Sequence, residues 1–179
     1  MLVPCQAAVN SAQDPLRRWC GSLAALLLAV TAACGQAPGS SPVIGSDLAA
    51  RATSVCEAAI ASKQAWAAFP IPSFDPTHPA ASALPQVATW LQDEVSPTFD
   101  TWLSDLRALG TPGTGKEPWS RVLAAVERIV ELNAAQVAAS KSGDSSAFAT
   151  ATNDLRASQV ELEAATAAAG VPKCADVHK

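Results

Sequence analysis

Five cysteines are the residues of this chain with the clearest potential for covalent chemistry. A thiol can be acylated, or it can pair with a second thiol as a disulfide, and the surrounding sequence indicates which reaction applies. Cys5, Cys20 and Cys34 lie close to the N-terminus, whereas Cys56 and Cys174 lie far apart in the rest of the chain. The two groups are therefore expected to have different roles.

Cys34 follows a short apolar run that has positive charge before it and small residues after it. Arg17 and Arg18 precede the run Ser22–Val30, and Thr31-Ala32-Ala33 leads to Cys34. This order is typical of a secretory signal peptide with its cleavage site. The run is shorter than the roughly 20 residues that a membrane-spanning helix needs. We therefore expect residues 1–33 to be cleaved and the remainder to be exported.

Residues 30–35, Val-Thr-Ala-Ala-Cys-Gly, resemble the bacterial lipobox, whose cysteine receives diacylglycerol. Thr31 stands where that motif most often has Leu. The resemblance implies that Cys34 is lipidated and that the membrane is a partner of the protein, which is then anchored at the outer face of the cytoplasmic membrane. The alternative is a plain cleaved signal that leaves Cys34 free. Residues 34–45 have the composition of a flexible tether.

Cys56 and Cys174 are expected to form a disulfide, because exported proteins keep such bonds. Geometry supports the pairing if the first and last helices of the domain meet at one end. Cys56 then lies about 15 Å along its helix from Ser46. The residues after Gly170 can turn back over roughly 13 Å. The rival interpretation, a reactive thiol pair, lacks the neighbouring basic groups that lower a thiol pKa.

The elements that position these residues are predicted to be helices throughout. Alanine is frequent, Tyr is absent, and apolar residues recur at helical spacing over four segments, at about 47–68, 82–109, 118–142 and 145–169. A Pro-rich segment at 69–79, a Pro-Gly turn at 111–115, and Gly143 separate them. This pattern predicts an all-α domain over residues 46–179, an up-down-up-down four-helix bundle.

Pro97 falls inside the second helical pattern, Leu84, Ala88, Leu91, Val95, Phe99, Trp102, Leu106 and Leu109. Either the helix kinks there, or Ser96 begins a new segment with Pro97 at its first position. The uninterrupted apolar stripe favours a kink.

Aromatic residues gather at the bundle end that the Pro-rich segment is expected to cover. Connections as long as this segment are often functional. It is also expected to act as an extended strap that packs Phe69, Ile71 and Phe74 over the bundle end. We interpret five residues as a candidate site for a protein partner or a small apolar ligand, with core packing as the alternative: Trp66, Phe69, Phe74, His78 and Trp90.

The sequence lacks the motifs of metal, cofactor and nucleic-acid binding. His78 and His178 are too few for a zinc or copper site, so both are expected to be solvated and no metal is predicted. Neither Glu-x-x-His, Cys-x-x-Cys-His nor a glycine-rich phosphate loop occurs, so no cofactor and no enzymatic activity are expected. The net charge of −4, without a basic cluster, argues against nucleic acid as a partner.

Three short patterns, Leu106-x-x-Leu109-Gly-x-Pro112, Gly143-Asp144-x-x-x-Phe148 and Gly170-Val171-Pro172-Lys173-Cys174, together resemble small helical lipoproteins of actinobacteria. The resemblance implies a helical bundle in the cell envelope, in proteins mostly without an assigned activity. We expect a non-enzymatic, lipid-anchored protein that binds a protein partner or a small apolar ligand. The alternative is a purely structural or accessory envelope subunit without a ligand pocket.

Overall fold

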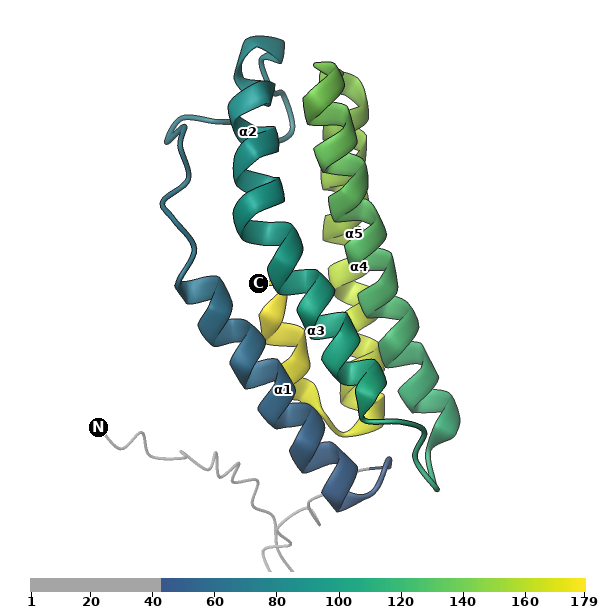
Figure 1. Cartoon of the computed structure of the whole chain (residues 1–179). Coiled ribbons are helices and arrows are strands. Elements are labelled where there is room, and N and C mark those ends of the chain that lie inside the picture. The colour runs from purple at the N-terminus through teal and green to yellow at the C-terminus, as the bar shows by residue number, and fades with distance from the viewer. Residues whose placement is uncertain (1–42) are drawn as a thin grey trace, which may run out of the picture. The chain divides into compact units, whose positions relative to one another are not determined.

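A computed structural model describes residues 43–179, and the predictions for the signal peptide, Cys34 and most of the tether lie outside these residues. Within this part the structure is all-helical, as predicted, and contains no strand. Five α-helices are present (Figure 1): α1 Ser46–Gln64, α2 Leu84–Trp90, α3 Ser96–Ala108, α4 Lys116–Ser142 and α5 Ser145–Ala169. Shorter helical segments are η1 Ala81–Ala83, the π-helical turn η2 Leu91–Val95, and the C-terminal 3-10 helix η3 Pro172–Val177.

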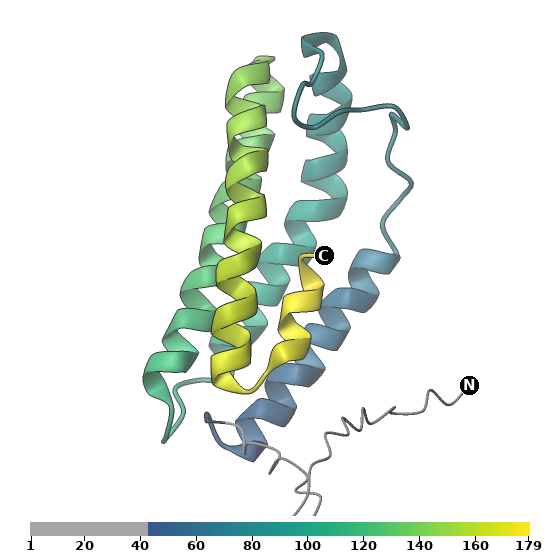
Figure 2. The same cartoon turned by 180° about the vertical axis from the view of Figure 1, so that it is seen from behind.

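Helices α4 and α5 form an antiparallel hairpin that both views show side by side (Figures 1 and 2). Gly143 ends α4 with a φ of 71°, a left-handed conformation that favours glycine. The Asp144 carboxylate then caps α5 by accepting a hydrogen bond of 2.9 Å from the N–H of Ala147. The sequence predicted the helix end at Gly143.

The predicted stripes of both hairpin helices face the core. On α4 all seven stripe positions are buried: Trp119, Val122, Val126, Ile129, Asn133, Gln136 and Ser140. On α5 five of the seven are buried, namely Phe148, Thr152, Leu162, Thr166 and Ala169, while Leu155 and Gln159 are half-buried. Two polar members join the helices, since the Gln136 amide donates to the Thr152 hydroxyl over 2.9 Å, whereas Ser140 Oγ is buried without a hydrogen-bond partner in the described part of the chain.

The second expected helix is divided into α2, the π turn η2 and α3, which follow one another without a loop. Both the backbone N–H and the hydroxyl of Ser96 donate to the carbonyl of Leu91, five residues earlier. Pro97 has no N–H to donate to the preceding turn, and the wider π turn lies directly before it. The structure thus shows a new segment, α3, that begins at Ser96 with Pro97 in its first turn, and a π turn that joins it to α2 with the apolar stripe in register.

Helix α1 ends at Gln64, four residues before the predicted end at Ala68. Ala65 and Trp66 donate their N–H groups to carbonyls three residues back, which tightens the last turn and releases the chain toward the strap. Leu48, Ala52 and Ala59 of the predicted stripe are buried, whereas Ser62 is exposed. Ser62 still lies within α1, and its hydroxyl donates to the Ala58 carbonyl at the exposed surface of the helix, so the buried part of the stripe ends at Ala59.

The packed domain begins before α1, at Ile44, which is 2% exposed and belongs to the core. The carbonyl of the preceding Val43 accepts a hydrogen bond of 3.3 Å from the Thr114 hydroxyl. The last residues of the segment expected to be a tether are therefore in contact with the domain.

The C-terminal tail folds back as η3 between α1 and α5 (Figure 2). Gly170 ends α5 with a φ of 81°, and the N–H of Val171 donates to the Thr166 carbonyl over 2.9 Å. The disulfide between Cys56 and Cys174 is present, with a Cα to Cα distance of 5.0 Å, and this prediction is confirmed. Both cysteines are fully buried, so the bond fastens η3 to the inner face of α1.

Candidate functional site

The segment between α1 and η1 lies as a strap over the bundle end. Phe69, Ile71 and Phe74 are half-buried and pack against the core, as the strap interpretation predicted. Two local turns shape the strap, because Phe74 and His78 donate their N–H groups to the carbonyls of Ile71 and Asp75. The prolines of the segment remove donors and restrict the residues before them, which keeps the strap extended elsewhere.

Trp90 is the centre of a set of edge-to-face ring contacts. Its ring centroid lies 5.6 Å from that of Trp66 at an interplanar angle of 87°, and 5.0 Å from that of Phe69 at 87°. Such perpendicular arrangements place the positive edge of one ring against the negative face of another. Four of the five predicted site residues thus lie in one continuous set of ring contacts, since Phe74 lies 5.5 Å from Phe69.

The same contacts continue into the core on both sides. Trp66 packs on Phe99 of α3 at 6.0 Å, and Phe74 packs on Phe148 of α5 at 5.7 Å. We refer to these six residues as the aromatic cluster: Trp66, Phe69, Phe74, Trp90, Phe99 and Phe148. Phe99 and Phe148, which the sequence assigned to helix stripes, connect the cluster to the bundle.

Both indole N–H groups of the cluster have hydrogen-bond partners. Trp66 Nε1 donates to the Thr98 hydroxyl over 2.9 Å, and Trp90 Nε1 donates to the Ala67 carbonyl over 3.0 Å. The N–H of Ala67 in turn donates to Glu94 Oε2 over 3.2 Å. These bonds fix both indoles and join the start of the strap to the helical segment that carries Trp90.

His78 lies in the strap but is separate from the ring contacts. Its side chain is 86% exposed, and its Nδ1 lies 3.2 Å from Asp75 Oδ2. The hydroxyl and N–H of Thr77, together with His78, donate to Asp75 and lower the pKa of that carboxyl to about 2. Asp75 and His78 therefore stabilise a turn at the surface of the strap.

An open hollow lies beside the aromatic cluster, with a volume of about 420 Å³. The strap supplies Ala68 and Pro70 on one side. The other side is one face of the helical segment α2 and η2, with Gln86, Thr89, Trp90, Asp93 and Glu94. Among the predicted site residues, Trp90 is the one that lines this hollow, while the other rings of the cluster lie against each other.

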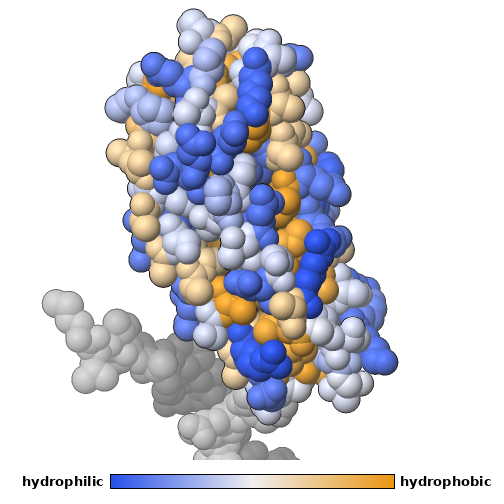
Figure 3. All heavy atoms as spheres, in the orientation of Figure 1, coloured by the Kyte–Doolittle hydropathy of each residue, from blue (hydrophilic) through white to orange (hydrophobic). Residues whose placement is uncertain are grey.

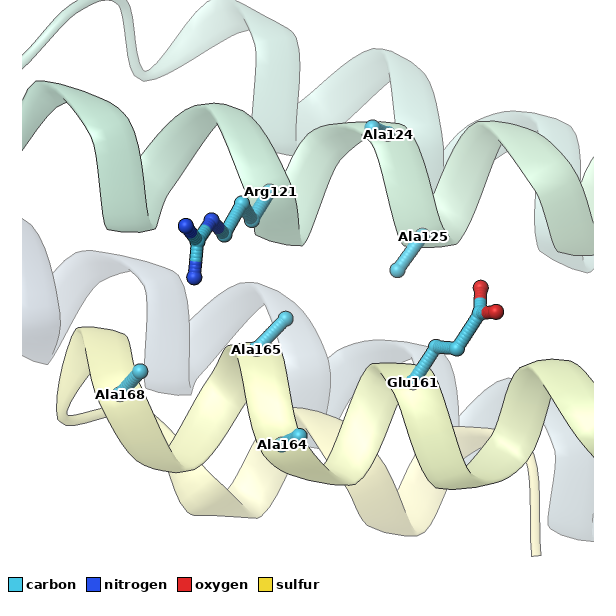
Figure 4. A pocket seen from close by; sticks show the side chains of 7 residues that line it. All are labelled: Arg121, Ala124, Ala125, Glu161, Ala164, Ala165 and Ala168. Atoms are coloured by element: carbon cyan, nitrogen blue, oxygen red, sulfur yellow. The ribbon is translucent and has the colours of Figure 1, made fainter.

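A second hollow, of about 380 Å³, lies between α4 and α5 and is lined mostly by alanine (Figure 4). Arg121 and Glu161 stand at its two ends, with Ala125 and Ala165 between them. Arg121 pairs with Glu117 of its own helix, so its charge is already compensated. Small residues allow neighbouring helices to approach closely. This hollow is the shallow groove that remains at the surface where α4 and α5 pack through their alanines.

The tail forms a polar cluster that the sequence did not indicate. His178, expected to be solvated, is half-buried, and its Nδ1 lies 2.7 Å from Gln159 Oε1 on α5. Burial, and then the positive charge of Lys63 on α1, lower the pKa of His178 to about 4. The Lys63 ammonium donates to the Val177 carbonyl over 3.3 Å, and burial lowers its pKa as well.

In the sequence, the only feature that could have indicated this cluster is the presence of apolar residues at the end of the chain. Val177 is fully buried, and Cys174 carries the disulfide, so both hold the tail in place. His178 follows them directly and is drawn against Phe99, at a ring distance of 6.1 Å. His178 is therefore placed by its neighbours in the sequence, the buried Val177 and the disulfide-bonded Cys174.

Hydrophilic residues cover much of the face visible in Figure 3, and hydrophobic residues form a band between them that runs toward the lower end of the view. Over residues 43–179, Val43 and Val160 are the large apolar side chains that are exposed. No helix in this part of the chain is long and apolar enough to cross a membrane. Nor do the described residues contain a group of three His, Cys, Asp or Glu side chains that could hold a metal ion.

Comparison of this chain with protein-family models, with curated proteins and with solved structures finds no match in any of the three.

Proposed function

We propose that this protein is a non-enzymatic lipoprotein, anchored through Cys34 at the outer face of the cytoplasmic membrane. In this proposal the aromatic cluster end of the domain binds a small apolar ligand or a protein partner. Residues 1–33 act as the signal peptide, and the segment after Cys34 separates the domain from the membrane. The signal-like order of residues up to Cys34 supports the anchor.

We also propose that the domain is best described as an up-down-up-down four-helix bundle. In this description α2, η2 and α3 count as one rod, because no loop interrupts them. Short connections at 109–115 and 143–144 favour antiparallel neighbours on either side of α4. The tail helix η3 is then an addition that packs against α1 and α5.

The observation that carries the binding proposal is the half-exposed Trp90 at the edge of a hollow. Tryptophan is among the residues that contribute most to binding, because a rigid ring buries a large apolar area at small entropic cost. The strap and the hydrogen bonds of both indoles hold the ring in one orientation before any ligand arrives.

A second candidate function is a purely structural envelope subunit. The specific observation in its favour is that most rings of the cluster contact each other, and that both indole N–H groups have hydrogen-bond partners within the protein. Such an arrangement also stabilises a fold that has no ligand.

Lipidation is tested with a fatty acid that carries a chemical label, fed to cells that produce the full chain. We expect label on the wild-type protein and on Cys20→Ala, whose cysteine lies in the predicted signal peptide. Cys34→Ala is expected to carry none. Label that persists on Cys34→Ala contradicts the lipobox interpretation.

Binding is tested by purifying the full-length protein in mild detergent and identifying co-purified molecules by mass spectrometry. We expect a specific molecule on the wild type and on Val160→Ala, a control that truncates an exposed apolar side chain of α5. Trp90→Ala is expected to lose it while its helical content remains, as measured by circular dichroism. A wild type that is monomeric and free of ligand favours the structural alternative.

A further inference from the structure

The hollow beside Trp90 combines an indole with carboxylates. Two of its side chains, Asp93 and Glu94, are carboxylates, and no Lys or Arg lines it. Within residues 43–179 neither carboxylate forms a salt bridge. An indole and two uncompensated negative charges therefore share one open space.

These groups converge because they are near one another in the chain. Asp93 and Glu94 lie three and four positions after Trp90, and all three line the hollow from the same segment. The π turn begins directly after Trp90 and contains both acids. Glu94 is fixed further, because its Oε2 accepts the N–H of Ala67 at the start of the strap.

This combination fits a cation that carries an apolar body. A cation is attracted to the face of an indole by the ring quadrupole, and to carboxylates by their charge. An anion is repelled by both acids, and a neutral apolar molecule gains nothing from them. The volume of about 420 Å³ lies within the range of small-ligand sites.

A protein surface is a poorer fit to the same place. Stable protein interfaces bury about 1,000 Å² or more and surround a central anchor with further apolar contacts. Over the described residues, the exposed large apolar side chains are Val43 and Val160, and neither lines the hollow. Trp90 therefore lacks the apolar surroundings that an interface of that size requires.

We propose that the hollow formed by Trp90, Asp93, Glu94 and the start of the strap binds a small organic cation, an alkylammonium or guanidinium compound. This inference rests on the proposed ligand-binding function and specifies the chemical class of its ligand. Because the hollow is open to solvent, its carboxylates are screened by water and salt, and the binding is weak and salt-dependent.

The test compares choline with 3,3-dimethylbutan-1-ol, an uncharged molecule of nearly the same shape. Each is titrated into the full-length protein in a non-ionic detergent, and the indole N–H resonance of Trp90 is followed by NMR. Choline is expected to shift this resonance saturably, and the alcohol is expected to cause no saturable shift. Added NaCl is expected to weaken the choline titration. Equal responses to both molecules overturn the proposal.

Matched variants locate the charge that is responsible. The isosteric double variant Asp93→Asn, Glu94→Gln is expected to weaken choline binding by about fivefold. Asp100→Asn removes an exposed carboxylate of α3 that does not line the hollow, and it is expected to leave binding unchanged. An unchanged affinity in the double variant overturns the proposal.

The outcome separates this inference from the proposed function. If choline does not bind while a co-purified molecule still depends on Trp90, the organic cation is the wrong ligand class and the ligand-binding function stands. If no molecule binds in either experiment, both are wrong.

Discussion

The imidazole of His178 is held neutral by its surroundings at the end of the chain. Gln159 Nε2 donates to Glu163 and to the Ala175 carbonyl, which fixes the amide and leaves its Oε1 to accept from His178. Lys63 faces the ring from α1, and Phe99 packs on it from α3. Protonation of His178 adds a second positive charge beside Lys63, and it creates no ion pair that compensates for this charge.

Stability is therefore expected to fall as the pH decreases from about 6.5 to about 4. Below pH 6.5 the unfolded chain gains a proton at His178, while the folded chain does not until its pKa of about 4. Unfolding becomes easier over this window, and the loss is complete once the folded state is also protonated. Between pH 7 and pH 4.5 we expect this residue to account for about 1 to 2 kcal/mol of unfolding free energy.

Urea unfolding of wild type and His178→Gln at both pH values measures this contribution. Glutamine keeps a hydrogen-bonding side chain but does not titrate, so the variant is expected to lose less stability on acidification. The pKa of Asp75 is about 2 and that of Asp176 is also lowered, so both stay ionised over this window. Identical losses in the two proteins contradict the assignment to His178.

Among the elements, the π turn and α4 are linked by a partly buried hydrogen bond at Ser96, the residue that follows the turn. The Asn133 amide, 3% exposed, donates to the Ser96 hydroxyl over 2.8 Å. That hydroxyl donates to the Leu91 carbonyl of the π turn. Within the described part of the chain, the other atom of the amide, Asn133 Oδ1, is buried without a hydrogen-bond partner.

Ser96→Ala is expected to destabilise the domain by about 1 to 3 kcal/mol, because it leaves the buried Asn133 amide without its acceptor. Asn133→Leu removes both the donor and the unpaired carbonyl, so we expect little loss or a gain. The double variant is expected to be more stable than the sum of the single changes predicts. Chemical unfolding of the three variants tests this cycle.

An exposed serine provides the control. Ser62→Ala on α1 is expected to change stability by no more than about 0.5 kcal/mol. If Ser96→Ala has an effect equally small, the bond to Asn133 has no role in fastening the π turn to α4.

In these elements the buried positions could be predicted from the sequence, but the π turn could not. Apolar spacing predicted nearly every buried position from Leu84 to Leu106, because burial of one helix face follows directly from a regular repeat. The π turn was not predicted, because Pro97 shows where the backbone bonding is interrupted but not in what form, and the bond of Ser96 to Asn133 reaches a separate helix. Spacing within one helix carries no information about that partner.

At the scale of the whole molecule, the cysteine pair was predictable and the tail structure was not. Cys56 and Cys174 were paired from the compartment and from the reach of the chain, and the structure confirms the bond. The residues around Cys174 form η3 and bury Val177, although their sequence has no helical repeat. Their conformation depends on the groove between α1 and α5, which exists only once the bundle has formed.

Of the candidate site, sequence reasoning could predict that Trp66, Phe69, Phe74 and Trp90 lie together, because a Pro-rich strap must cross the bundle end. His78 was included in the candidate site and also expected to be solvated, and the structure shows the solvated position, with its side chain beside Asp75 at the surface. Sequence reasoning did not indicate Asp93 and Glu94, which have the appearance of an ordinary solvated helix face.

The disulfide is expected to supply a large part of the stability of the domain. It links residues separated by 118 positions, and closing so long a loop in the unfolded chain accounts for roughly 4 to 5 kcal/mol in the entropy model. The double variant Cys56→Ala, Cys174→Ala is therefore expected to melt at least about 10 °C below the wild type. Calorimetry or circular dichroism measures the difference.

Hydrogen exchange distinguishes a global role from a local clasp. Without the disulfide, amides of η3 are expected to lose protection first, because only packing and the Lys63 and Gln159 contacts still hold the tail. Trp102→Phe, which removes the indole N–H that lies 3.4 Å from Cys56 Sγ but keeps the bond, is the control and should leave η3 protected. If the double variant melts with the wild type and η3 stays protected, helix packing alone fixes the tail, since the bond then constrains nothing that packing does not already hold.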